Sequence, residues 1–327
     1  MMTFRRTFLA TVAALAITAL VAGPAPGAAD APPTVTIAYQ PGIGYSTLII
    51  IKQLGTLEKR FPGTKFDWRV LTNGDAIRDG IIAGQIQIGA GGNGPFLIGW
   101  DRGVGYKLIA PMNVMNLWMV ARADEPNIRS IKDIPANAKI GMPSPDAVQA
   151  IALRKAAQET FGDPHKFDTN ILAIQHPLGV QALAAKQLEL HMSAPPFQQQ
   201  EVEAGGHVVF RSFLAFGRST FNSVYTTENF AKQYPVFVKV LFDEMVNATN
   251  TLKRDPDAAA ALLSKDADGK PPAARFKGWI TGPDVSWDMT PHAFLRTAAF
   301  MKEIGMLTKV PANIRELELP FLKGAGD

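Results

Sequence analysis

The chain has 327 residues, 47% of them hydrophobic, which is enough for a large buried core and for two lobes or one big domain. It has no cysteine, so disulfides, thiolate metal sites, cysteine nucleophiles and lipoprotein anchoring are excluded. The formal net charge is +4, but no basic run appears beyond the first 30 residues, which argues against nucleic acid as a partner.

Residues 1–29 are predicted to be an export signal. The pair Arg5-Arg6 precedes an apolar run, Phe8–Ala22, and small residues follow up to an expected cleavage after Ala28 or Ala29. The run is short for a membrane span and rich in Ala and Thr. The arginine pair also resembles a twin-arginine signal, so the Sec route and the twin-arginine route both stay open. The mature chain is expected in a bacterial periplasm.

Strands and helices alternate through most of the chain. The first unit is a β-branched strand at Thr34–Tyr39, a loop at Gln40–Ser46 and a helix at Thr47–Lys59. After about Ser223 the strands are expected to stop and the chain to become helical. This alternation predicts an α/β fold with a parallel or mixed sheet and a helical C-terminal part. Further strands are expected at 66–71, 85–88, 106–111, 117–121, 138–142, 170–174 and 207–210, and further helices at 145–161, 235–253 and 291–303.

The stretch Ala76–Trp100 combines a helix, a strand, a loop and a second helix. The first helix is expected to end at Gly84, and the strand follows it. The loop Gly89–Gly94 has almost no side chains, and Pro95 suits the first turn of the next helix. Ligands of open α/β sheets bind beyond the carboxyl ends of strands. The sequence therefore predicts that this loop, through Gly91, Gly92 and Asn93, contacts a ligand.

A similar stretch occurs about a hundred residues later, at Gly179–Gln199. Aligning the two places Gln187 on Gln85 and Leu190 on Ile88, with Ser193-Ala194 on the glycine pair. One interpretation is chance similarity between two helix–strand units. The other is a pair of similar α/β lobes that each present a bare loop to a shared cleft. The second interpretation adds Ala194, Pro195 and Phe197 to the predicted ligand contacts.

Other strand ends supply further candidates. The loop after the first strand places free backbone N–H groups at a helix start, which suits an anion. Ser144 is a natural N-cap for the helix that ends near Phe161. Asp146 would lie in the first turn of that helix, where it either stabilises the helix or faces the cleft and binds a donor group of the ligand. The additional candidates are Gln40, Pro41, Gly42, Gly44, Tyr45, Trp118, Ser144 and Asp146.

The sequence contains no catalytic constellation. The five histidines are scattered without metal-ligand spacing, and no nucleophile elbow, P-loop or dinucleotide fingerprint is present. His191, just before the second bare loop, is either an ordinary buried histidine or a site residue. We therefore expect no catalytic residue, no metal and no cofactor.

Together the motifs resemble those of the periplasmic substrate-binding proteins of bacterial ABC importers for nitrate, taurine and aliphatic sulfonates. The sequence departs from that family's pattern at Gln87 and Glu189, where Asp is usual, and at Pro195-Pro196, where a single proline is commoner. These departures affect the ligand's identity and leave the fold intact. The resemblance covers nearly the whole mature chain, in Ile37–Gly44, Ala83–Gly89, Gly91–Pro95, Ile128–Ile134, Ile140–Ser144 and Thr290–Gly305.

The resemblance implies two α/β lobes, joined by two crossing segments, that close on a ligand in a central cleft. Lobe 1 would comprise residues 31–118 and 223–327, and lobe 2 residues 119–222. The implied function is capture of a small anion, such as a sulfonate, taurine or nitrate, for delivery to an ABC permease and its ATPase in the inner membrane. The chain is expected to be a monomer. A pyrimidine precursor or an aromatic acid is an alternative ligand, and an enzyme on this fold is a further alternative.

Overall fold

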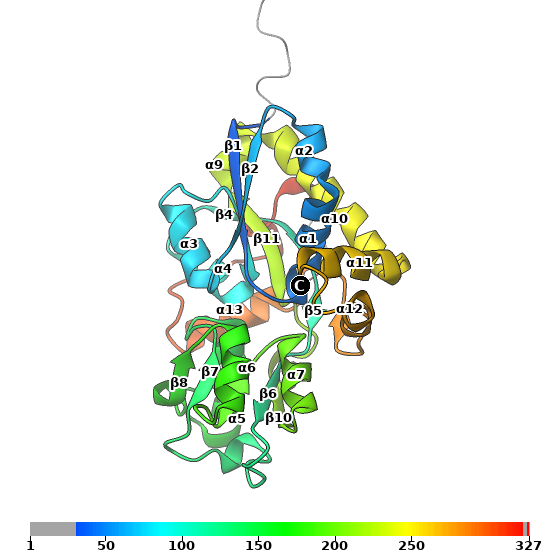
Figure 1. Ribbon diagram of the computed structural model, residues 1–327. Coiled ribbons are helices and arrows are strands. Elements are labelled where there is room, and N and C mark those ends of the chain that lie inside the picture. Colours follow the sequence, from blue (N-terminus) through cyan, green and yellow to red (C-terminus); the bar gives the residue numbers. More distant parts are fainter. Residues whose placement is uncertain (1–30, 323–325, 327) are drawn as a thin grey trace, which may run out of the picture.

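The computed structural model describes residues 31–322 and residue 326. The predicted export signal, residues 1–29, lies outside this part of the chain. Figure 1 shows an upper and a lower lobe, each built around one sheet. Among the described residues, no helix combines the length and the apolar composition needed to cross a membrane.

The upper lobe, lobe 1, contains a five-stranded sheet of order β2-β1-β3-β11-β4. Strand β1 pairs in parallel with β2 and β3, whereas β11 pairs antiparallel with β3 and β4. These strands are β1 (Thr34–Tyr39), β2 (Lys65–Val70), β3 (Ile88–Gly92), β4 (Tyr106–Pro111) and β11 (Asn222–Thr227). Its helices are α1 (Ser46–Leu54), α2 (Thr56–Arg60), α3 (Gly74–Ile82), α4 (Asn93–Asp101), α9 (Glu228–Gln233), α10 (Pro235–Arg254), α11 (Pro256–Asp266), α12 (Ala273–Ile280) and α13 (Phe294–Glu303).

The lower lobe, lobe 2, contains a second five-stranded sheet of order β10-β6-β9-β7-β8. Strand β7 is parallel to β8 and β9, and β6 is antiparallel to β9 and β10. Its strands are β6 (Trp118–Ala121), β7 (Ile140–Met142), β8 (Ile171–Ala173), β9 (Leu190–Met192) and β10 (His207–Arg211). Its helices are α5 (Val148–Phe161), α6 (His176–Ala184) and α7 (Phe197–Glu203), and α8 (Phe213–Phe216) follows β10 in the segment that leaves this lobe.

The chain crosses between the lobes twice, before β6 and after β10. The crossings are the segments 112–117 and 212–221, and the first contains the short strand β5 (Val114–Met115), which pairs with β12 (Val285–Ser286). The two sheets thus divide the chain close to the predicted lobe boundaries. The boundaries at residues 118 and 223 themselves stay a prediction.

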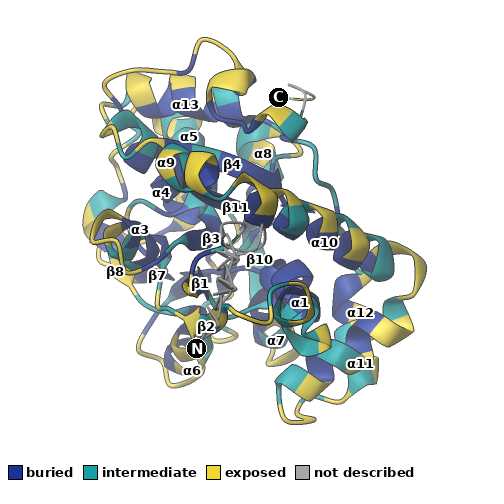
Figure 2. Ribbon diagram, turned by 90° about the horizontal axis from the view of Figure 1, so that it is seen from above, coloured by how far each residue is buried: buried dark blue, intermediate teal, exposed yellow. Residues whose placement is uncertain are grey.

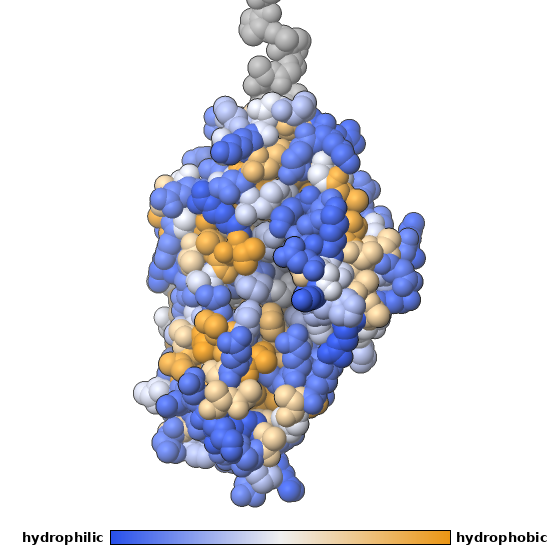
Figure 3. Space-filling view, viewed as in Figure 1, coloured by the Kyte–Doolittle hydropathy of each residue, from blue (hydrophilic) through white to orange (hydrophobic). Residues whose placement is uncertain are grey.

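Apolar side chains fill the space between each sheet and its helices. In α10 the buried residues Phe237, Leu241 and Met245 recur at helical spacing, and Figure 2 shows the exposed residues of α10, α11 and α12 on their outer sides. In lobe 1 the ring of Phe96 lies 5.7 Å from that of Tyr106 and 5.3 Å from that of Tyr225. Figure 3 shows apolar side chains on both sides of the boundary between the lobes.

The predicted bare loop at Gly89–Gly94 is wrong, because most of these residues form strand β3. The strand runs from Ile88 to Gly92 and the next helix begins at Asn93. Small residues are needed here for packing: a Cβ on Gly89 would lie 2.8 Å from side-chain atoms of Ile77, Ile81 and Tyr225. The glycines therefore lie within a buried strand rather than in an open loop.

The expectation that strands end near Ser223 is also wrong. Strand β11 begins at Asn222 and lies between β3 and β4 in the first sheet. The predicted helix at Thr47–Lys59 is two helices, because Gly55 between them has a left-handed conformation with φ 59°. The predicted N-cap Ser144 precedes a turn, and α5 begins only after Ala147, which supplies no side-chain cap. The helix predicted at 291–303 begins at Phe294, after Ala293.

Candidate ligand pocket

A pocket lies between the two lobes, at the carboxyl ends of β1, β3, β7, β8 and β9. The space open to the centres of water molecules is about 30 Å³. The pocket is therefore narrow, and its walls come from both lobes. It is lined by Gln40, Pro41, Gly42, Gly44, Tyr45, Gly74, Gly92, Pro95 and Asn222 of lobe 1, by Phe221 of the second crossing, and by Pro143, Ala147, Val148, Gln149, His176, Ala194 and Pro195 of lobe 2.

Lobe 1 contributes a small hydrogen-bond network. The Tyr45 hydroxyl accepts from Gln40 Nε2 at 2.8 Å and from Asn222 Nδ2 at 3.0 Å. Both lone pairs of that oxygen are engaged, so its proton can be donated to a ligand. Asn222 Oδ1 is buried and lacks a hydrogen-bond partner in the described structure. Burial raises the pKa of Tyr45 well above its usual value, so lobe 1 offers a neutral donor and a neutral acceptor.

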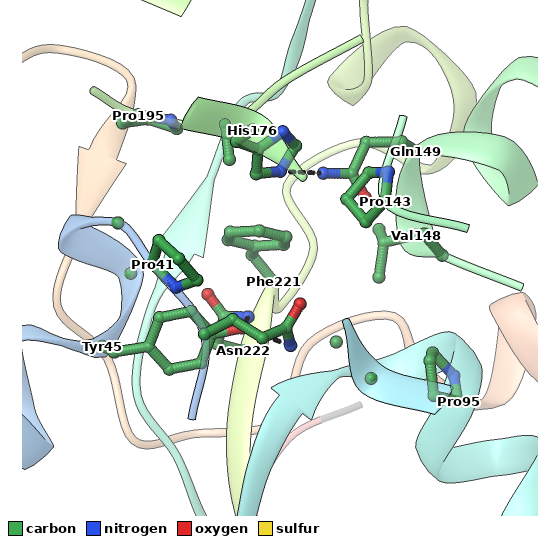
Figure 4. Close-up of a pocket in the computed structure, with 17 residues that line it drawn as sticks. Pro41, Tyr45, Pro95, Pro143, Val148, Gln149, His176, Pro195, Phe221 and Asn222 are labelled. Atoms are coloured by element: carbon green, nitrogen blue, oxygen red, sulfur yellow. Dashed lines mark hydrogen bonds between the residues drawn. The ribbon is translucent and has the colours of Figure 1, made fainter. Parts of the chain in front are cut away.

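Lobe 2 contributes Gln149 and His176. Their side chains lie 3.2 Å apart, and Figure 4 shows them across the pocket from Tyr45 and Asn222, with the ring of Phe221 between. Burial, reinforced by the neighbouring His191, lowers the pKa of His176 well below its usual value. Among the residues that the structure describes, no Asp, Glu, Lys or Arg lines the pocket. At neutral pH the walls of the pocket are therefore uncharged.

The pKa of His176 gives the protein a predictable loss of stability in acid. Its folded-state pKa is depressed, so the unfolded chain binds more protons below about pH 6.5, the ordinary histidine pKa. We expect the ligand-free protein to lose stability as the pH falls from about 6.5, with a slope contribution of up to about 1.4 kcal/mol per pH unit. Urea unfolding between pH 7 and pH 5 measures this slope. The substitution His176→Gln should reduce it, and an unchanged slope would contradict the assignment.

Asparagine side chains of the first crossing form hydrogen bonds with the second crossing, with the residue that follows it and with the loop after β1. Asn113 Nδ2 donates to Gly44 O at 2.6 Å, and Asn113 Oδ1 accepts from Asn222 N at 3.3 Å. Asn116 Oδ1 accepts from Phe213 N at 3.1 Å. These bonds tie the crossings to each other and to the pocket loop after β1, a geometry that suits a hinge.

Polar contacts also join the lobes at the rim of the pocket. Arg78 Nη1 of α3 lies 3.3 Å from Asp146 Oδ2 of lobe 2, and the same guanidinium contacts Asp75 and Asp79. Asp146 does not line the pocket, and it precedes α5 rather than lying in its first turn. The structure therefore gives Asp146 a different contact from either predicted role, an ion pair across the cleft.

We expect Asp146→Asn to weaken the closed form equally for every ligand. The pair is partly exposed, so its loss should cost at most about 1 kcal/mol, or about fivefold in Kd. Calorimetric titration with a zwitterionic aminosulfonate and with the corresponding simple sulfonate tests this result. A loss confined to the zwitterion would show instead that Asp146 contacts the ligand.

Eight of the fourteen predicted ligand residues line the pocket. They are Gln40, Pro41, Gly42, Gly44, Tyr45, Gly92, Ala194 and Pro195. Their contact with a ligand stays a prediction. Seven of them follow the carboxyl ends of strands and Gly92 is the last residue of β3, so the criterion of strand ends selected them correctly as lining residues.

The other six lie elsewhere. Gly91 is inside β3, and Asn93 donates its amide to Thr220 O at 2.9 Å. Trp118 donates from Nε1 to Asp284, and Ser144 Oγ accepts from the backbone N of Asp146. Asp146 pairs with Arg78 as described. Phe197 stacks on His176 with ring centroids 5.5 Å apart and lines an adjoining cavity of about 250 Å³, measured in the same way, which shares Gln40, Pro41 and Gly42 with the pocket.

Sequence reasoning missed three of the polar residues of the pocket. Gln149 and His176 each follow the carboxyl end of a strand, β7 and β8, so the rule that found the glycines could have found them. Asn222 was missed because it begins an antiparallel strand that the sequence did not predict. In the described part of the chain, no group of three His, Asp or Glu residues could hold a metal ion.

The geometry defines a two-lobed protein with a pocket between its lobes. The model of the NMT1-like family matches residues 28–264, so the chain belongs to that family. No curated protein sequence matches the chain.

Solved structures share this two-lobe fold, which is that of periplasmic binding proteins. The alkanesulfonate-binding protein SsuA from Xanthomonas axonopodis pv. citri, bound to MOPS, is 19% identical with a TM-score of 0.70, over 85% of this chain and 95% of that one. The aliphatic sulphonate binding protein SsuA from Escherichia coli is 17% identical with a TM-score of 0.65, over 88% and 92% of the two chains. The nitrate-binding protein NrtA from Synechocystis PCC 6803 is 13% identical with a TM-score of 0.67, over 90% and 86%.

Proposed function

We propose that this chain is the solute-binding component of an ABC-type importer, working in the periplasm. It captures one small ligand between its lobes and delivers it to a membrane permease with an associated ATPase. The observation that carries this proposal is the pocket lined from both lobes beside two crossing segments joined by hydrogen bonds. A pocket of this kind suits closure on a ligand. Membership of the NMT1-like family and the fold shared with sulfonate- and nitrate-binding proteins support it.

The ligand that we propose is a small anion of the sulfonate or nitrate kind. The uncharged walls would hold it through neutral donors such as the Tyr45 hydroxyl, because backbone and side-chain N–H and O–H groups can bind an oxyanion without a formal charge. The protein releases the ligand unchanged, since the lining groups include no nucleophile paired with a base.

A neutral heteroaromatic ligand, such as a pyrimidine, is the second candidate. It is favoured by the absence of charged side chains in the lining and by the apolar surfaces of Phe221, Val148 and four prolines. Such a pocket, apolar with a few convergent polar groups, is common for uncharged ligands.

A thermal-shift screen tests the function and separates these ligands. Ethanesulfonate, taurine, nitrate, benzoate and a set of pyrimidines should be tested on the mature chain. A ligand at 100 times its Kd stabilises the folded state by about 2.7 kcal/mol, which raises Tm by several degrees. Calorimetry should then give one ligand per chain, and the recovered ligand should be unaltered. Turnover of the ligand, or no shift with any member of the panel, would contradict the proposal.

A further inference from the structure

A buried chain of hydrogen bonds runs from the pocket into lobe 2. Gln149 Nε2 lies 3.2 Å from His176 Nε2, and His176 Nδ1 lies 3.3 Å from His191 Nε2. His191 Nδ1 contacts Glu201 Oε1, and Ser193 Oγ donates to Glu201 Oε2 at 3.0 Å. His191 and Ser193 are 0% exposed and Glu201 is 2% exposed. The pocket is therefore connected to an internal carboxylate through two imidazole rings.

The carboxylate of Glu201 sets the donor and the acceptor of every hydrogen bond in this series. An ionised Glu201 can only accept, so His191 donates from Nδ1 and its Nε2 must accept when the ring is neutral. His176 then donates from Nδ1, and its Nε2 accepts from the amide nitrogen of Gln149. Both rings are in the same tautomer, and all the protons point toward Glu201.

Glu201 has no permanent cation beside it. Among the described residues, its one ion-pair contact is His191, which is charged only when protonated. Glu201 is also among the residues that line a surface cavity, together with Arg122, Asp124 and Lys186. Arg122 and Lys186 are occupied there, because both contact Asp124 and Arg122 also contacts Glu125 and Glu189. A buried carboxylate without a cation is unfavourable, and a proton on the histidine pair would supply one.

The groups packed around His191 leave few other sources of charge. Its ring contacts Gly179 of α6 and Gly141 of β7, where an added Cβ would lie 2.3 Å and 3.3 Å from ring atoms. Across the sheet it pairs with Val120 of β6. His176 from α6 and Glu201 from α7 are the titratable side chains that contact it.

One added proton would reverse the hydrogen bonds at the pocket end. With Glu201 paired to an imidazolium, His176 donates from Nε2, and the Gln149 amide must turn to accept with its oxygen. Turning the amide exchanges its donor and acceptor ends. A proton on the pair thus offsets the negative charge of Glu201 behind the pocket and changes the polarity of Gln149, and both changes favour an anion.

We propose that the pocket takes up an anionic ligand together with one proton, which the His176–His191 pair holds between the ligand and Glu201. This inference rests on the proposed function and specifies its ligand as an anion. The proton comes from solvent, and no covalent bond forms or breaks. In the free protein burial keeps His176, the ring next to the pocket, neutral; the proposed proton enters the pair together with the anion.

Ethanesulfonate is the appropriate probe, because it stays ionised at every pH used and any pH dependence belongs to the protein. Titration calorimetry at pH 7 in phosphate and in Tris, which have different ionisation enthalpies, should show uptake of close to one proton per ligand. The Kd should rise about tenfold for each pH unit from 6 to 8, because one proton is bound with the ligand. Equal heats in the two buffers and an unchanged Kd would overturn the inference.

Two variants test whether the proton uptake depends on the buried hydrogen bonds that end at Glu201. Glu201→Gln keeps the shape and removes the internal charge, so proton uptake should fall below half a proton and the pH dependence should flatten. Glu244→Gln is the matched control, since Glu244 is a 7% exposed carboxylate in α10 whose partner is Arg60. That variant should keep the full uptake. Loss of uptake in both variants, or in neither, would contradict the assignment.

Nitrogen NMR of the histidine rings gives a readout that does not depend on affinity. In the ligand-free protein both rings should carry their proton on Nδ1, and saturation with ethanesulfonate should produce one ring protonated on both nitrogens. Binding with unchanged rings overturns the proton coupling and leaves the proposed function standing. Absence of binding by every member of the panel at pH 6 and at pH 8 overturns both. If a pyrimidine binds and no anion does, the proposal of an anionic ligand is wrong, and the proposed function of solute capture still stands.

Discussion

Gly92→Val is expected to weaken binding of every ligand by about 5- to 150-fold while the protein stays folded. A Cβ on Gly92 would lie 2.8 Å from Val148 Cγ2, which belongs to the opposite lobe, and both residues line the pocket. Overpacking at such a contact costs about 1–3 kcal/mol, and here the lobes can avoid it by staying apart. The expected change is therefore a population shift toward the open form.

Small-angle scattering and calorimetry on the same samples test this explanation. The wild-type protein should become more compact on saturation with ligand, and Gly92→Val should not. Gly63→Val is the control, because an added Cβ there meets no atom within 4 Å. If Gly92→Val lowers affinity but closes normally, the glycine acts by letting the ligand reach the backbone, as the sequence suggested.

Phe96→Ala should destabilise the folded protein by about 3–5 kcal/mol, the usual range for removing a buried phenylalanine ring. Phe96 is 1% exposed and lies between Tyr106, Tyr225 and Phe294, with its ring edge-on to that of Phe294 at 6.2 Å. Tyr225 belongs to β11 beside β3, so the cavity would open behind the strand whose last residue, Gly92, lines the pocket.

Urea unfolding measures the change, with Leu214→Ala as a control because Leu214 is 73% exposed. The control should change the free energy of unfolding by less than about 0.5 kcal/mol. A loss below about 1 kcal/mol in Phe96→Ala would mean that the aromatic cluster collapses into the cavity and that the ring contributes little.

Local sequence patterns were sufficient for most of the fold. The strand predicted at Tyr106–Pro111 has the same bounds in the structure, and the helix predicted at Pro235–Lys253 differs by one residue. Both segments carry their signal within a few residues, as alternation or as a helical stripe. Similarly, the loop after β1 could be placed in the pocket, because ligands of open α/β sheets bind beyond the carboxyl ends of strands and the order of elements alone identifies those ends.

The errors arose where distant residues decide the structure. Gly89 to Gly92 lack the side chains that indicate a strand, and they form one because β1 and β11 pair with them on either side. Likewise, Ser144 has the chemistry of an N-cap, yet the chain makes a further turn before α5 begins. His191 could not be linked to Glu201 from spacing alone, since that contact depends on α7 packing against the sheet.

The late arrival of β11 has a consequence for the order of folding. Strand β4 is joined to the rest of the first sheet through β11, which is separated from it by all of lobe 2. Lobe 2 is one continuous stretch of chain, whereas lobe 1 needs contacts between residues more than a hundred positions apart. Contacts of such long sequence separation form slowly. As the polypeptide emerges from its N-terminus, lobe 2 can therefore complete its sheet first, and the nascent first sheet must wait, with its edges unpaired, for residues 222–227.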